Sequence, residues 1–196
     1  LLKKVPFLSS CLAICQSFLF LTGVTRVAFP FLAANYRGLS LETVGTIVSI
    51  SRLTDTFGRY GGGWLCDRMN SSRVILLGVA VGIPMFAVQA YGSGFVTLLV
   101  PLAVMTMGFG FTNVGATTFA LQSASSGAKE LSLGISRAST SVGQTIGPLL
   151  CGALIEQVGY EFGFQAMGII SLVVLCFVWV GLRREWVQSS RFKVQR

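Results

Sequence analysis

Long apolar runs separated by short polar connections make up most of this sequence of 196 residues. No Asp, Glu, Lys or Arg occurs from Val74 to Ala128, which leaves room for two crossings of a bilayer at about 20 residues each. Backbone groups in hydrocarbon must form their hydrogen bonds within their own segment, so runs of this length predict helices rather than the strands of a barrel. The apolar runs predict six transmembrane helices, over residues 8–34, 41–65, 74–91, 95–121, 132–155 and 163–182.

The composition agrees with residence in a membrane and excludes several classes of protein. Charged residues make up only 11% of the chain, whereas about 25% is usual in a soluble domain. Soluble enzymes and soluble binding domains are therefore excluded. The chain contains no His, a residue that zinc hydrolases, His-ligated haem proteins and Ser-His proteases need. We expect an all-α membrane protein that is not an enzyme and holds neither a metal nor a cofactor.

Lys and Arg gather on one side of the predicted bundle. This basic side comprises Lys3, Lys4, Arg68, Arg73, Lys129, Arg183, Arg184, Arg191, Lys193 and Arg196. The opposite side has only Arg37, with Glu42, Glu156 and Glu161. The positive-inside rule then predicts that both termini, including a short basic tail over residues 183–196, are cytoplasmic, in a plasma or inner membrane. Topology thus explains the net charge of +8, and the lipid bilayer rather than nucleic acid is the expected partner.

The connection after the second predicted helix carries a motif, which reads Gly63-Trp64-Leu65-Cys66-Asp67-Arg68. It resembles the loop of the major facilitator superfamily, in which Gly-x-Leu-x-Asp-Arg-x-Gly-Arg-Arg joins the second and third helices of a six-helix half. The sequence departs from that pattern at Asn70, which stands where the family has Gly, and has Arg73 as its next cation. Asn tolerates the left-handed backbone conformation better than most residues, so we expect the turn to be kept.

This resemblance implies that the loop gates the cytoplasmic side of a transporter. Alternating access needs contacts that form in one state and break in another. An ionised Asp accepts hydrogen bonds from a helix N-terminus or an Arg, and Arg side chains bridge neighbouring helix ends. The alternative is a solvated polar loop that only fixes the topology. The residues assigned to the gate are Gly63, Asp67, Arg68 and Arg73.

The fifth predicted helix carries a second pattern of small residues. It resembles the glycine and proline pattern in the fifth helix of drug-proton antiporters of the same superfamily, with Cys151 in place of one Gly. Small residues let helices approach closely, and Gly-Pro permits a bend. Generic membrane packing is the alternative interpretation. The residues expected to pack against a neighbouring helix are Gly134, Gly143, Gly147, Pro148 and Gly152.

Polar residues inside the apolar runs are candidates for a substrate site. A charge in a membrane span costs several kcal/mol unless it is paired or hydrated, so such residues are functional candidates by default. On the fourth predicted helix, Thr106, Gly110, Asn113 and Thr117 follow helical spacing and are expected to face a cavity. The residues assigned to substrate binding are Arg26, Arg52, Asp55, Asn113, Arg137 and Gln144.

Each of these charged residues has two interpretations. Arg52 and Arg59 lie within one helical turn of Asp55 and hold it ionised, which favours a structural ion pair over proton carriage. Arg26 and Arg52 lie near the middle of their spans, where an excess of Arg over acid suits either a substrate carboxylate or phosphate, or internal pairing. Arg137 is placed equally well to reach the cytoplasmic surface.

The resemblance extends over nearly the whole chain and implies one six-helix half of a transporter, with the other half as its partner. The expected function is secondary active transport of a small solute by alternating access. No Arg occurs from Pro101 to Phe111, and a basic tail ends the chain, which favours the C-terminal half; the fifth-helix pattern favours the N-terminal one. Proton-coupled efflux agrees with that pattern, and uptake of an organic anion agrees with the Arg residues. A membrane scaffold without transport activity, or an inactive half, is the remaining alternative.

Overall fold

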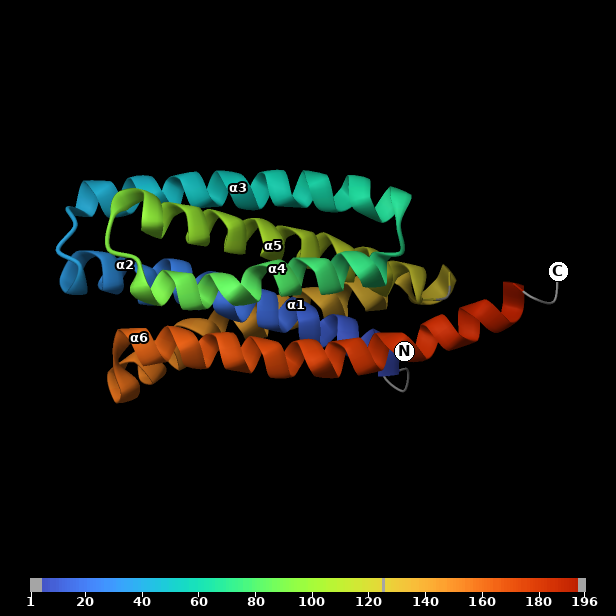
Figure 1. Ribbon diagram of the computed structural model, residues 1–196. Coiled ribbons are helices and arrows are strands. Elements are labelled where there is room, and N and C mark those ends of the chain that lie inside the picture. The colour runs from blue at the N-terminus through green and yellow to red at the C-terminus, as the bar shows by residue number, and fades with distance from the viewer. Residues whose placement is uncertain (1–4, 125, 194–196) are drawn as a thin grey trace.

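The computed structural model describes residues 5–124 and 126–193 and shows a bundle of long helices (Figure 1). No strand occurs in these residues, so the prediction of an all-helical fold is confirmed. The first rod, Val5–Tyr36, comprises α1 (Val5–Gly23), α2 (Phe29–Phe31) and two π-helical segments, Val24–Ala28 and Leu32–Tyr36. The long elements that follow are α3 (Leu41–Arg68), α4 (Ser71–Tyr91), α5 (Phe95–Gln122) and α6 (Lys129–Lys193), with a 3₁₀ turn at Ser126–Ala128.

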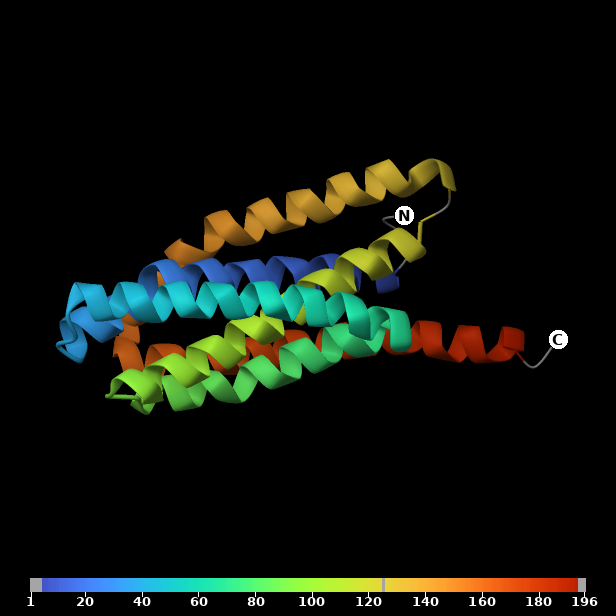
Figure 2. The same ribbon diagram turned by 90° about the horizontal axis from the view of Figure 1, so that it is seen from above.

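Helix α6 reverses direction at Gly159. The backbone there has φ 78° and ψ 174°, a conformation that residues with a Cβ rarely adopt. Figure 2 shows the two parts of α6, residues 129–158 and 160–193, running along the bundle in opposite directions. We call these parts the first arm and the second arm. The reversal lies between the spans predicted at 132–155 and 163–182.

The described residues contain four stretches that are long and apolar enough to cross a membrane, rather than the six that the sequence predicts. The first rod, α4, α5 and α6 supply these stretches. Two features of the chain account for the difference. Both arms of α6 belong to one element, and α3 carries Arg52, Asp55 and Arg59 along its length, which lowers its hydropathy.

Both described ends of the chain lie at the same end of the bundle as the connection between α3 and α4 (Figure 1). Helix α6 continues to Lys193, through most of the segment predicted as a basic tail. Several residues of the predicted basic side lie outside the described residues, or have side chains that do. They are Lys3, Lys4, Arg184, Arg191, Lys193 and Arg196.

Arg37 joins three parts of the bundle at the opposite end. Its Nη2 donates a hydrogen bond to the carbonyl oxygen of Ala90, the penultimate residue of α4, at 2.9 Å. The same nitrogen lies 3.6 Å from Oε1 of Glu161, at the start of the second arm. The rings of Tyr36 and Tyr160 pack beside this ion pair with their centroids 5.4 Å apart. The first rod, α4 and the second arm are thereby tied together at this end.

Helix α1 and the first arm of α6 touch backbone to backbone. A Cβ placed on Gly143 would overlap the carbonyl oxygen of Cys15, and one on Gly147 would overlap that of Leu19. Absence of a side chain at these two positions is therefore what permits the contact. We call Gly143 and Gly147, with the α1 backbone they meet, the glycine seam.

The other small residues of the fifth-helix pattern lie outside this seam. Gly134 is exposed, and no atom lies within 4 Å of the position that a Cβ would take there. Gly152 meets only a side-chain methyl of Val27, at an ordinary 4.0 Å. Pro148 is half-buried inside the first arm. The sequence pattern did not show that Gly143 and Gly147 would contact α1 while the other three residues would not. The spacing of small residues does not tell how close a neighbouring helix lies to each of them.

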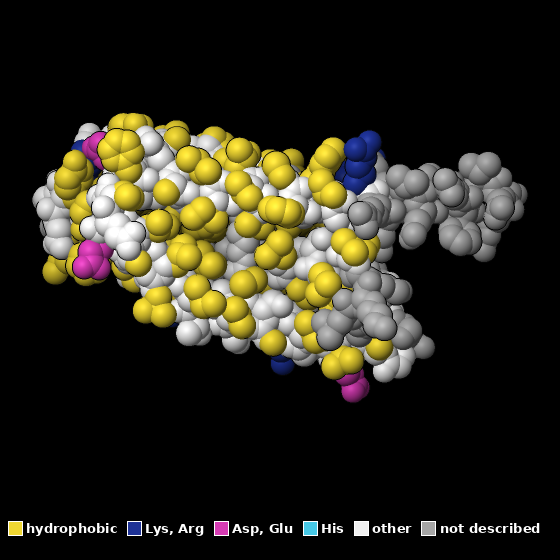
Figure 3. All heavy atoms as spheres, turned by 90° about the horizontal axis from the view of Figure 1, so that it is seen from below, with side chains coloured by type: hydrophobic (Ala, Val, Ile, Leu, Met, Phe, Trp, Pro, Cys, Tyr) yellow, Lys and Arg dark blue, Asp and Glu magenta, His cyan; other side chains and the backbone are white. Residues whose placement is uncertain are grey.

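Hydrophobic side chains fill the inside of the bundle and also cover its outside. Inside, the rings of Phe20 on α1 and Phe86 on α4 pack edge to face with their centroids 5.3 Å apart. Outside, Figure 3 shows hydrophobic side chains over the whole middle of one face, with charged side chains toward its ends. Large exposed apolar residues on the second arm include Leu172, Val173 and Phe177. A surface of this kind suits contact with lipid rather than water.

Candidate functional site

A group of charged side chains lies along one face of α3. Asp55 is buried, and its Oδ2 accepts hydrogen bonds from Nε and Nη2 of Arg59 at 3.2 and 3.0 Å. Its other oxygen, Oδ1, is buried without a hydrogen-bond partner among the described residues. The Asp55 carboxylate is thus held within its own helix by an ion pair with the residue four positions on.

Arg52 connects α3 to the first rod. Its Nη2 donates a hydrogen bond to Oγ1 of Thr25 at 2.6 Å. The charged groups that act electrostatically on Arg52 are Asp55, Arg26 and Arg59. Three guanidinium groups and one carboxylate give this group a net charge of +2. We call these four residues, Arg26, Arg52, Asp55 and Arg59, the arginine cluster.

Arg26 extends from a π-helical segment of the first rod and is exposed. The segment ends at Ala28 and is capped by Phe29, whose N–H donates a hydrogen bond to the carbonyl oxygen of Val24, five residues back. Pro30 explains this shift, because its ring clashes with the carbonyl of the residue four positions earlier, which is Arg26. A π-helical segment turns the following side chains relative to a regular helix and is frequent at functional sites. Sequence reasoning missed this segment, although Pro30 was an available signal.

The polar residues of α5 divide between packing and partial exposure. Thr106 is buried; its hydroxyl donates to the carbonyl oxygen of Ser51 at 2.8 Å and lies 2.9 Å from Oγ1 of Thr54. A Cβ on Gly110 would lie only 2.7 Å from the carbonyl oxygen of Asp55. These two residues therefore pack α5 against α3 instead of facing a cavity as expected. The remaining members of the stripe, Asn113 and Thr117, are half-buried.

Two predicted substrate residues lie apart from the arginine cluster. Arg137 and Gln144 are both exposed on the first arm of α6. Throughout residues 5–124 and 126–193, neither is joined to the arginine cluster by a hydrogen bond or ion pair. The structure brings together Arg26, Arg52 and Asp55, and these two residues make no such contact with them among the described residues. In the same residues, no group of His, Cys, Asp or Glu has an arrangement that would hold a metal ion.

The residues assigned to the gate lie at the connection between α3 and α4. Asp67 and Arg68 are exposed at the end of α3, and the guanidinium carbon of Arg68 lies 4.1 Å from the ring centroid of Trp64. Arg73 is exposed in the first turn of α4. No atom lies within 4 Å of the position that a Cβ on Gly63 would take. The charged groups are therefore accessible at this end of the bundle.

Asn70 does not adopt the left-handed conformation that we expected from its place in the motif. Its φ of −63° and ψ of 132° are extended, and it is the N-cap of α4. The side-chain Oδ1 accepts a hydrogen bond from the N–H of Ser72 at 3.1 Å. Capping an otherwise unpaired N–H explains why Asn serves here without a left-handed turn.

Replacement of Asn70 tests this capping role. Asn70→Ala is expected to lower the free energy of unfolding by about 1 kcal/mol, because the cap is lost, whereas Asn70→Asp is expected to keep most of it. Asn70→Gly should cost only a few tenths of a kcal/mol. The apparent melting temperature of the purified protein in detergent reports these differences. A stabilised Asn70→Gly variant would instead indicate a left-handed turn at this position.

Comparisons with known proteins agree on one family. The chain is 27% identical over 157 residues to a di-/tripeptide transporter of Lactococcus lactis subsp. cremoris, a match that covers 79% of this chain. It spans about a third, 32%, of the length of that relative. A solved peptide transporter in complex with sulfate has a TM-score of 0.77 at 17% identity, over 90% of this chain and 37% of that one.

A second solved structure, from work on substrate recognition in proton-dependent oligopeptide transporters, has a TM-score of 0.70 at 19% identity. It covers 91% of this chain and 40% of that one. At identities of 17% and 19%, the similarity between these two structures and this chain shows a common fold alone. The proteins matched are transporters and not enzymes. The family model of the Major Facilitator Superfamily matches residues 7–195, nearly the whole chain, and the chain therefore belongs to this superfamily of transporters.

Proposed function

We propose that this chain forms one six-helix half of a proton-coupled transporter for short peptides, which works by alternating access. Its relatives of known name transport di- and tripeptides, and the chain spans about a third of their length. We assign it to the C-terminal half, with the other half of the same transporter as its partner. Both termini are placed on the cytoplasmic side, as the Lys and Arg distribution favours.

Six crossings are compatible with the lengths of the helices. Helix α3 has 28 residues, so at a rise of about 1.5 Å per residue it is about 42 Å long. That length exceeds the hydrocarbon core of a bilayer, which is about 30 Å thick. The ion pair between Asp55 and Arg59 lowers the cost of placing α3 there. Each arm of α6 supplies a further crossing under this proposal.

The observation that carries the proposal is the net charge of +2 in the arginine cluster. Arg52 lies about 16 Å along α3 from Leu41, near the middle of the helix. A short peptide has a terminal carboxylate, and guanidinium groups bind carboxylates with two parallel hydrogen bonds. Arg26, which is exposed, and Arg52, which is half-buried, are suited to this contact. Asp55 is occupied by Arg59, which favours a structural role for Asp55.

An exposed apolar stripe on α3 supports the presence of a partner half. Leu53, Phe57, Tyr60 and Trp64 recur at helical spacing, and each is between 55% and 77% exposed. The stripe lies on the helix that carries Arg52, so a second bundle packed against it would enclose the arginine cluster from the other side. Asp67, Arg68 and Arg73 then lie where cytoplasmic contacts between the halves would open and close.

Flux into proteoliposomes tests the proposal. The chain, joined to its partner half as in the whole transporter, is reconstituted and given labelled dialanine, with and without a pH gradient that is acidic outside. We expect saturable uptake, stimulated by the gradient and inhibited by unlabelled dipeptide; vesicles preloaded with peptide test efflux. Absence of peptide flux in either direction would contradict the proposal. Flux of simple organic anions instead would support the second candidate, an anion transporter, which rests on the same excess of Arg.

A further inference from the structure

Two guanidinium groups of the arginine cluster carry positive charge that no acid balances within residues 5–124 and 126–193. Asp55 accepts two hydrogen bonds from Arg59, so the charges of these two residues offset each other. Arg26 and Arg52 take part in no ion pair in the same part of the chain. The net charge of +2 in the cluster therefore belongs to Arg26 and Arg52.

The other acids of the described chain are too distant to supply this balance. Along α3 the nearest one before Arg52 is Glu42, in the first turn, which lies about 15 Å away at a rise of about 1.5 Å per residue. A charge in the middle of a membrane span is costly unless it is paired or hydrated. A bound solute that brings two negative charges would pair both guanidinium groups. The acids near helix ends are Glu42, Asp67, Glu130, Glu156 and Glu161.

A hydroxyl group of the first rod holds Arg52 in place. Nη2 of Arg52 donates to Oγ1 of Thr25 at 2.6 Å, and the Thr25 hydroxyl in turn donates to the carbonyl oxygen of Leu21. This is the single hydrogen bond that Arg52 makes through its side chain among the described residues, so its other N–H groups remain available to a ligand. Arg26 follows Thr25 directly in the chain. The anchor thus brings Arg52 beside the backbone from which Arg26 extends.

The face of α3 around Arg52 has room for a ligand. Small and polar residues recur on it at helical spacing, and none of them is buried. No atom lies within 4 Å of the position that a Cβ would take on Gly45 or Gly63. This face adjoins the exposed apolar stripe of α3, so a partner half packed on that stripe would leave it lining a cavity. Its residues are Gly45, Ser49, Arg52, Thr56, Arg59 and Gly63.

We propose that Arg26 and Arg52 select dipeptides that carry two neighbouring carboxylates, namely those whose C-terminal residue is acidic. Arg52 binds the terminal carboxylate, and Arg26 binds the carboxylate of the side chain. Guanidinium groups hold carboxylates with two parallel hydrogen bonds, so each charge of the pair gains a partner of opposite sign. Arg26 is then the residue that determines specificity. This inference rests on the proposed function, whose substrate class it narrows.

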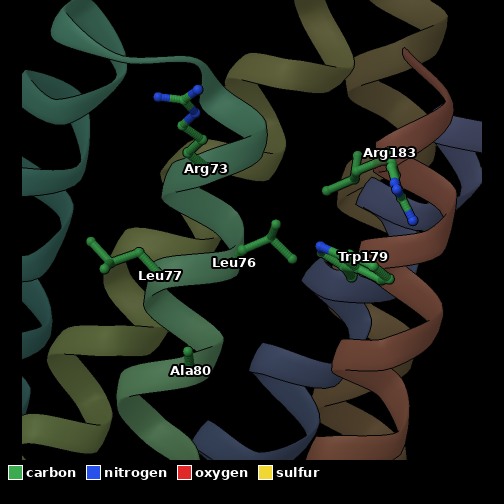
Figure 4. Close-up of a pocket in the computed structure, with 7 residues that line it drawn as sticks. Arg73, Leu76, Leu77, Ala80, Trp179 and Arg183 are labelled. Atoms are coloured by element: carbon green, nitrogen blue, oxygen red, sulfur yellow. The ribbon is translucent and has the colours of Figure 1, made fainter. Parts of the chain in front are cut away.

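A second pair of arginines on the bundle is arranged differently and supplies a control. Arg73 and Arg183 line a groove of about 490 Å³ between α4 and the second arm of α6, which shares no residue with the arginine cluster. Figure 4 shows the head of Arg73 pointing away from Arg183. The guanidinium carbon of Arg183 lies 5.1 Å from the ring centroid of Trp179. Arg183→Gln therefore removes an exposed cation outside the proposed site.

Two dipeptides of the same shape test the preference. The chain, joined to its partner half as in the whole transporter, is reconstituted in proteoliposomes, and kcat/KM is measured for labelled alanylaspartate, alanylasparagine and dialanine. An external pH of about 6 keeps the aspartate side chain ionised, since its usual pKa is about 3.9. We expect kcat/KM for alanylaspartate to exceed that for alanylasparagine about tenfold, the size of one hydrogen-bonded contact between charged groups.

Variants assign this preference to one residue. Arg26→Gln should make kcat/KM equal for the two peptides, whereas Arg26→Lys keeps the charge and should retain most of the preference. Arg52→Gln should lower kcat/KM for both peptides and leave their ratio near tenfold. The matched control, Arg183→Gln, should change neither value. An unchanged preference in Arg26→Gln would overturn the proposal.

Measurements on the parent protein can also overturn it. Equal kcat/KM for alanylaspartate and alanylasparagine would contradict the selection of two carboxylates, and transport of dialanine in that case would leave the proposed function standing. Inhibition of uptake by succinate as strong as by alanylaspartate would show that two carboxylates suffice without a peptide, which contradicts the proposal as well. Absence of flux for all three dipeptides would contradict the proposed function itself, and this inference with it.

Discussion

Arg52→Gln is expected to reduce kcat/KM for dipeptide transport by about 100-fold. The variant removes a half-buried guanidinium that donates to Thr25 and that carries part of the net charge of +2 in the arginine cluster. A hydrogen bond to a charged partner contributes about 1.5–3 kcal/mol, which corresponds to roughly 10- to 150-fold. Arg26→Gln removes an exposed group and should reduce kcat/KM by about tenfold. Initial rates of labelled dialanine uptake in proteoliposomes measure both effects.

A change of substrate and a change at Thr25 serve as controls. Dipeptide amidated at its C-terminus lacks the carboxylate, so the protein should prefer free dialanine over the amide, and Arg52→Gln should abolish that preference. Thr25→Val removes the hydrogen bond at 2.6 Å but keeps the Arg52 charge, and should lower uptake less than about fivefold. If Thr25→Val and Arg52→Gln reduced uptake equally, Arg52 would act by positioning the first rod and not by binding a carboxylate.

Gly143→Ala is expected to destabilise the protein by about 1–3 kcal/mol or more, and Gly143→Leu to prevent folding. The new Cβ would overlap the carbonyl oxygen of Cys15, and a backbone atom cannot rotate away as a side chain can. Gly147→Ala should behave in the same way against Leu19. The yield of monodisperse protein in size-exclusion chromatography, and its apparent melting temperature in detergent, report the loss.

Gly134→Ala is the matched control on the same arm. No atom lies within 4 Å of its Cβ position, so the substitution meets open space. Ala is the better helix former by up to about 1 kcal/mol, and the variant should be as stable as the parent or more so. Gly143→Ala is thus expected to lower the stability of the protein, and Gly134→Ala to leave it unchanged or raise it. Equal changes in stability at both positions would show that the contact with α1 does not determine the effect at Gly143.

The sequence predicted the start of α3 correctly, but it predicted the start of α4 three residues too late. Helix α3 begins at Leu41, at the predicted position, because Ser40 caps it by accepting a hydrogen bond from the N–H of Thr43 at 3.2 Å. Helix α4 begins at Ser71 rather than at 74, because Asn70 caps it and polar residues fill its first turn. Hydropathy does not detect such turns, and it also underrates α3, where Asp55 and Arg59 form an ion pair.

Prediction of the site was limited because the sequence does not show which side of a helix faces a neighbouring helix. The spacing of Asp55 and Arg59 sufficed to predict their ion pair, since both lie on one helix. The side of α5 that faces α3 was not predictable from spacing, so Thr106 and Gly110 were expected at a cavity and instead lie in a helix contact. The direction of Arg26 depends on a π-helical segment that we did not predict, although Pro30 was a signal for it.

The glycine seam limits how the bundle deforms. Helices slide past one another when interlocking side chains have two alternative arrangements. At Gly143 and Gly147 there are no side chains to rearrange, since main chain meets main chain. The close approach of α1 and the first arm therefore depends on Gly143 and Gly147 staying opposite the backbone of Cys15 and Leu19. The first arm ends at Gly159, the residue with non-helical backbone angles between the two arms.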